Sequence, residues 1–110
     1  MIHAEIEPGI CNLRTTVEAD CPDGMTVQLR IESECPRIRA LATELAELNA
    51  FQELFKPLRQ TLVAELAAKH QLHTACLAPV GILKAAEAAA SLALPADGHI
   101  KLARVEPDHS

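Results

Sequence analysis

Apolar and polar residues alternate along the first third of the chain, the pattern typical of half-buried β-strands. The alternation covers residues 2–6, then 11–19, and then 25–32. The sequence DCPDG at 20–24 separates the second stretch from the third and has the composition of a hairpin loop. The pattern therefore predicts three strands in an antiparallel meander.

The hydrophobic period then changes to that of helices. Apolar residues at helical spacing predict a first helix over 36–49, with a proline at its first position. A second helix is expected over about 58–70, and a third, rich in alanine, over about 79–92. HIKLARV at 99–105 is read as a short strand. The prediction is an α+β fold: a three-stranded antiparallel meander followed by three helices packed on one face, plus a short C-terminal strand.

The length of the chain fits one domain. Its 110 residues contain no internal repeat and no linker-like stretch, so residues 1–110 are predicted to form a single domain. Residues 106–110 are expected to be a frayed tail. Hydrophobic residues make up 49% and charged residues 23%, which is the composition of a globular protein rather than a disordered one.

The charge and the aromatic content argue against some partners. The formal net charge is −5, no basic run occurs, and the chain has no Trp or Tyr, so nucleic-acid binding is not expected. The start MIHAEIEPG does not resemble a secretion signal, and no apolar run approaches the roughly twenty residues of a membrane span. We therefore expect a cytoplasmic protein with no membrane contact.

Four cysteines in a reducing compartment favour metal binding or thiol chemistry over disulfides. If Ala19 faces Met25 across the hairpin, Cys11 faces Ser33 and lies one diagonal step from Cys35. Diagonal neighbours are about 7–8 Å apart. Two thiolates at that separation can reach one metal ion, since a Zn–S bond is about 2.3 Å long. Any single cysteine can also be a small buried hydrophobe.

The segment HQLHTACLAP at 70–79 adds further soft ligands. Cys35 precedes Pro36 and is expected at a helix N-cap, where free N–H groups favour a thiolate. Cys76 lies just ahead of, or within, the first turn of the third helix, and His73 is three residues earlier. The residues thus predict a Cys3His site made of Cys11, Cys35, Cys76 and His73.

Two further residues complete the set of candidates. His70 lies one turn before His73 and is the alternative fourth ligand. Cys21 falls in the predicted hairpin loop, at the far end of the strands, where it is expected to lie in an exposed loop and to take no part in the site.

The order of these motifs resembles that of the NifU/IscU-type iron–sulfur cluster scaffold proteins. The matching stretches are GICNLRTTVEAD, VQLRIESECPRIRALATEL and HTACLAPVGILKAAEAAA, which together lie within about residues 9–93. The resemblance implies a site for zinc or an iron–sulfur cluster, a role in iron–sulfur assembly or sulfur handling, and protein partners of sulfur or cluster transfer.

The chain departs from this family at three points. Thr74 and Ala75 separate the histidine from the cysteine, which are adjacent in the family. Leu13 stands where the family has an aspartate associated with cluster lability, so ready release of a cluster is not implied. LAAKHQL replaces the family's segment for chaperone recognition, so chaperone-assisted delivery is not implied either.

Two other functions are compatible with the same residues. In the first, Cys35 or Cys76 is a low-pKa nucleophile for sulfur transfer or redox exchange, with His73 as its base. In the second, the protein is an interaction module whose cysteines fill the core. No phosphate loop, carboxylate pair or Ser-His-Asp set is present, and no catalytic residue is assigned.

Overall fold

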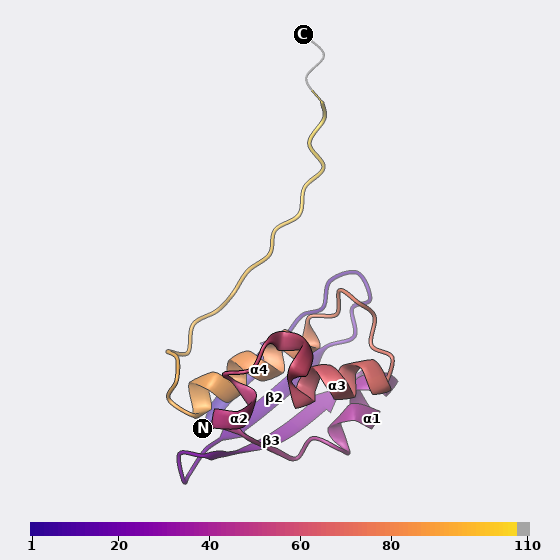
Figure 1. Ribbon diagram of the computed structural model, residues 1–110. Coiled ribbons are helices and arrows are strands. Elements are labelled where there is room, and N and C mark those ends of the chain that lie inside the picture. Colours follow the sequence, from indigo (N-terminus) through magenta and orange to yellow (C-terminus); the bar gives the residue numbers. More distant parts are fainter. Residues whose placement is uncertain (108–110) are drawn as a thin grey trace.

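The chain folds around one antiparallel sheet whose strands follow the order β1-β2-β3-β4, as the computed structural model shows for residues 1–107 (Figure 1). The strands are β1 (Ile2–Ile6), β2 (Thr15–Asp20), β3 (Thr26–Ser33) and β4 (Glu47–Asn49). The first three strands form the predicted meander. The fourth was not predicted.

The helices cover one face of this sheet. They are α1 (Pro36–Ala42), α2 (Ala50–Glu53), α3 (Leu62–Lys69) and α4 (Ala78–Ala89), with a 3-10 turn, η1 (Leu58–Gln60), ahead of α3. Helix α4 packs on β1 and β2, and α1 packs on β3. The α+β class and the order of a meander followed by helices are confirmed.

The period-two pattern of the strands explains why only one face is covered. Alternate residues of the strands turn toward the helices and form one buried cluster with them. The strand side chains of that cluster are Ile6, Val17, Ala19, Val27, Leu29 and Leu48. The opposite face carries polar and charged residues and is open to solvent. None of the helices formed by residues 1–107 is long and apolar enough to cross a membrane.

The predicted helix over 36–49 is wrong beyond Ala42. The Thr43 hydroxyl donates to the carbonyl of Ala40 at 2.6 Å, and the helix ends there. The following residues cross to the edge of β3, where the Leu29 N–H donates to the carbonyl of Ala46 at 2.8 Å. Pairing with β4 satisfies backbone groups of β3 that a continued helix would leave unpaired.

The predicted register of the hairpin is also wrong. Ala19 faces Leu29 rather than Met25, and Ser33 faces Thr15 rather than Cys11. The Asp23 carboxylate explains the longer loop, because it accepts the N–H groups of Met25 and Thr26 at 2.9 and 2.8 Å. These amides therefore need no partner on β2.

The predicted C-terminal strand at 99–105 is absent from the described structure. Residues 93–107 form no helix or strand and extend away from the end of α4 (Figure 1). Within the expected frayed tail, residues 106–107 belong to this extended segment, whereas 108–110 lie outside the described residues.

A buried carboxylate fixes the start of α3. Glu53 is only 3% exposed, and its two oxygens accept the N–H groups of Leu62 and Val63 at 2.7 and 2.9 Å. The Thr61 hydroxyl accepts a third, from Ala64, at 3.1 Å. These bonds satisfy amides that have no partner within the helix.

The contact between α4 and β1 depends on a glycine. A Cβ atom on Gly81 would lie 2.3 Å from Cδ1 of Ile6, which is closer than two carbon atoms can approach. Gly81 therefore lets the first half of α4 rest directly on the end of β1. This contact holds the start of α4 beside the loop that follows β1.

Candidate functional site

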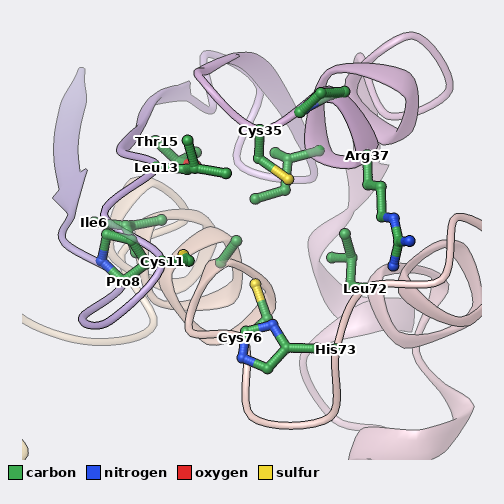
Figure 2. Close-up of a pocket in the computed structure, with 13 residues that line it drawn as sticks. Ile6, Pro8, Cys11, Leu13, Thr15, Cys35, Arg37, Leu72, His73 and Cys76 are labelled. Atoms are coloured by element: carbon green, nitrogen blue, oxygen red, sulfur yellow. The ribbon is translucent and has the colours of Figure 1, made fainter.

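A pocket of about 320 Å³ lies where the ends of β1, β2 and β3 meet the starts of α1 and α4. The side chains of Cys11, Cys35, His73 and Cys76 all line it. Figure 2 shows the three cysteines approaching it from three sides, with His73 beside Cys76. The structure thus brings the four predicted ligands, from three distant segments, to one pocket.

Cys35 occupies the N-cap of α1, as predicted, and Pro36 opens the helix. The Ser33 hydroxyl accepts the N–H of Cys35 at 3.0 Å and is itself bonded to the hydroxyl of Thr15 at 2.7 Å. The Arg39 guanidinium donates to the carbonyl of Ser33 at 2.7 Å. These bonds fix the backbone of Cys35 at the pocket. Because α1 has seven residues, its dipole is smaller than that of the predicted helix.

Cys11 lies in the loop between β1 and β2 rather than on a strand. The N–H of Asn12 donates to the carbonyl of Gly9 at 3.0 Å, so Cys11 occupies a central position of a tight turn. Arg14 and Glu34 fasten the end of this loop through two bonds of 2.9 Å. Cys11 is exposed, and it is the least restrained of the three pocket cysteines.

His73 and Cys76 share a turn just before α4, where the N–H of Cys76 donates to the carbonyl of His73 at 3.0 Å. His73 is exposed and Cys76 is half-buried. The Arg37 guanidinium donates to the carbonyl of Gln71 at 2.6 Å, which ties this loop to α1. Arg37 therefore links the segment that carries Cys35 to the segment that carries His73 and Cys76.

His70, the alternative ligand, lies outside the pocket. It caps the C-terminus of α3, and its Nε2 forms a short contact with the carboxylate of Glu44. Lys69 contacts the same carboxylate at 2.6 Å, and these two partners lower the pKa of Glu44. His70 is thus engaged in an ion-pair cluster, whereas His73 faces the pocket.

Cys21 lies apart from the other three, at the opposite end of β2. The loop that carries it is exposed, as expected, although Cys21 itself is half-buried against the core. Burial, together with the negative charge of Asp23, raises the pKa of its thiol. Cys21 is therefore poorly suited to bind a metal.

The pocket has the donor types of a soft-metal site. As placed, however, no three His, Cys, Asp or Glu side chains within residues 1–107 lie close enough together to hold a metal ion. Binding would require the side chains to draw inward. The turn around Cys11 can supply such a movement, because few bonds restrain it.

Sequence reasoning missed the apolar wall of the pocket and its one arginine. Leu13, Ile38 and Leu72 provide apolar wall, and Arg37 contributes the only permanent charge among the lining residues. The position of Arg37, two residues after Cys35, is the signal that could have revealed it. No carboxylate lines the pocket, whereas the charge of Asp23 acts on Cys21.

The chain belongs to the family of unknown function DUF6951, whose model matches residues 2–102. No curated protein and no solved structure matches it. The family match includes all pocket residues and extends ten residues past Leu92, into the extended tail.

Proposed function

We propose that the protein binds a soft metal centre, zinc or an iron–sulfur cluster, through Cys11, Cys35, Cys76 and His73. The observation that carries the proposal is the convergence of three thiols and an imidazole on one pocket. Cysteines that only fill the core are not expected to converge on one pocket from three distant segments of the chain. Soft ligands in this combination are those that zinc and iron–sulfur clusters take.

A single zinc ion and an iron–sulfur cluster differ in how closely they bring their thiolate ligands together. With Zn–S bonds of about 2.3 Å, two thiolates on one zinc ion are at most about 4.6 Å apart. A cluster takes each thiolate on a separate iron atom and so tolerates wider spacing. A zinc ion would therefore require the larger inward movement of the side chains, which as placed within residues 1–107 are not close enough together to hold a metal ion.

Arg37 supports the proposal electrostatically. Several thiolates gathered in one apolar pocket repel one another. A guanidinium on the pocket wall offsets part of this cost, since it stays protonated at all relevant pH values. The absence of lining carboxylates avoids further repulsion.

The resemblance to NifU/IscU-type scaffolds suggests the role of such a centre. On that resemblance the protein would act in iron–sulfur assembly or sulfur handling, and would meet protein partners of sulfur or cluster transfer. It would do so in the cytoplasm, where free thiols stay reduced. We propose no catalytic residue.

The test is purification without oxygen, followed by measurement of zinc, iron and acid-labile sulfide and by an absorption spectrum. We expect close to one centre per chain in the wild type and in Cys21→Ser, and a clear loss in Cys35→Ser and Cys76→Ser. Cys21→Ser is the matched control, because it removes a half-buried thiol outside the pocket.

A protein free of zinc, iron and sulfide under these conditions would overturn the proposal. If one pocket cysteine of that protein were also alkylated much faster than the others, the pocket would be assigned to thiol chemistry instead. If all four cysteines were alkylated equally and slowly, the remaining interpretation would be an interaction module whose cysteines fill the core.

A further inference from the structure

The tail beyond α4 exposes apolar side chains that a solvated segment does not need. Leu94, Ile100, Leu102 and Val105 are 89%, 70%, 92% and 84% exposed. Extended linkers are usually polar, so a run of bare aliphatic residues points to a surface that covers them. The family match reaches Leu102, so this part of the tail belongs to the family's common region.

The tail has the pattern of a strand but no sheet to join. In HIKLARV at 99–105, Ile100 and Leu102 alternate with His99, Lys101 and Ala103. This alternation is typical of a strand with one covered face. In the structure the segment is extended, and it pairs with nothing among residues 1–107.

The sheet has a matching free edge at β1. This strand pairs with β2 on one side only, and no other backbone bond reaches it from the described part of the chain. Ile2 and Ala4 are on the helix-covered face yet only half-buried. A further strand beside β1 would bond its outward amide and carbonyl groups and cover both side chains.

The charges of Glu5 and Lys101 indicate which face of the sheet each residue of the added strand would occupy. Glu5 is exposed on the open face of β1. With Ile100 and Leu102 turned toward the helix side, Lys101 lies on the open side, near Glu5. Opposite charges on neighbouring strands stabilise a sheet, and this arrangement provides such a pair.

We propose that residues 99–105 add as a strand to the free edge of β1 in a second copy of this chain. The second copy is favoured because the tail runs away from its own sheet, giving the molecule a length of 60 Å against 29 and 24 Å across (Figure 1). Two copies can exchange tails reciprocally around a two-fold axis, which closes the assembly and leaves neither β1 edge open.

The first test is the mass of the full-length protein in solution, measured by light scattering over a range of concentrations. We expect a dimer whose dissociation constant rises at least roughly tenfold in Leu102→Asp, because the charge would enter the covered face. Leu94→Asp is the matched control. Leu94 is as exposed as Leu102 but lies outside the docking strand, and its change should alter the constant less than about twofold. A monomer at all concentrations, or equal effects of the two changes, would overturn the proposal.

The second test exchanges the charges of the proposed pair. Glu5→Lys and Lys101→Glu should each weaken the dimer, and the double variant should recover most of the loss. Amide hydrogen exchange of β1, measured on the same samples, identifies the edge that is covered. A monomer in which the tail protects β1 would overturn the proposal, because the strand would then join its own sheet.

Discussion

The two ends of the hairpin formed by β2 and β3 place the same residue type in opposite surroundings. At the loop end, Cys21 is half-buried beside Asp23, and both burial and that carboxylate hold its thiol protonated. At the other end, Cys11, Cys35 and Cys76 line a pocket that has an arginine and no carboxylate. The comparison teaches that exposure does not separate Cys21 from Cys35 and Cys76, which are all half-buried, whereas their charged neighbours do.

The largest expected effect is on thermal stability. With metal bound, a cysteine variant at the pocket end of the hairpin should lose much more stability than one at the loop end. A centre bound at a thousand times its dissociation constant adds about 4 kcal/mol to the free energy of unfolding. Cys35→Ser should therefore lower the Tm of the loaded protein by at least about 10 °C, at about 4 °C or more per kcal/mol. Thermal melts with and without a chelator measure this. Cys21→Ser should melt close to the wild type, and a protein whose Tm ignores the chelator would contradict the comparison.

The next effect concerns the packing that holds the pocket end together. Gly81→Ala forces a methyl group against Ile6 and should cost about 1–3 kcal/mol in urea unfolding. Ile6→Ala removes both atoms that this methyl would strike, Cδ1 at 2.3 Å and Cγ1 at 2.5 Å, so Gly81→Ala should cost less in the Ile6→Ala background than in the wild type.

Gly24, in the hairpin loop, is the contrasting case. A Cβ atom there meets nothing within 4 Å, and only its positive φ of 76° opposes a side chain. Gly24→Ala should cost about 1 kcal/mol, with no rescue by any change at Ile6. A cost of Gly81→Ala that is equally large in the Ile6→Ala background would show that the close contact is not the cause.

A smaller effect should distinguish the two histidines. His73→Ala removes a proposed ligand and should weaken metal binding at least roughly tenfold, as judged by competition with a chelator. His70→Ala should leave the affinity unchanged, since its ring contacts Glu44 outside the pocket. Equal losses in the two variants would contradict the assignment of His73.

The smallest effect is at Cys21. Asp23→Asn removes the negative charge that helps to raise the pKa of this thiol, so the pKa should fall and the thiolate fraction at pH 8 should rise. Alkylation of Cys21 should then be about twofold faster, because the thiolate is the reactive form. Asp97→Asn, in the tail, is the charge-matched control. A slower rate in Asp23→Asn would contradict the sign.

The sequence predicted which strand residues face the core but not how the strands are aligned. The expected pairing of Ala19 with Met25 differs from the observed pairing with Leu29 by four residues, an even number. An even shift keeps every side chain on its face, so Val17 and Val27 are buried as the alternation implied. The side-chain bonds of Asp23 in the loop determine the alignment, and the hydrophobic pattern carries no information about them.

The end of α1 was unpredictable for a related reason. Leu41, Leu45 and Leu48 fit a helical period, and all three are buried. The unpaired edge of β3 nevertheless draws Leu48 into β4, since a backbone group without a partner costs more than a shortened helix. The hydrophobic period of the sequence does not reveal that the edge of β3 needs a pairing strand.

The gathering of the cysteines was predicted through an alignment that proved wrong. Cys11 does not face Ser33. It reaches the pocket because the loop between β1 and β2, which carries it, extends beyond the edge of the sheet where β2 begins. The N-cap position of Cys35 was predictable, since Pro36 marks the first turn of a helix. The closeness of Arg37 to Cys35 in the sequence indicated that it lies near the pocket, but its bond to Gln71 was not predictable because it joins segments 34 residues apart.

The buried carboxylate of Glu53 also makes one stretch of the surface suitable for engineering. Because Glu53 holds the start of α3 directly, the chain between Leu54 and Lys56 does not set the position of that helix. Lengthening such a connection costs little, about 0.6 kcal/mol for each doubling of its length. A peptide tag or a fluorescent label inserted after Phe55 should therefore leave the core and the cysteine pocket undisturbed.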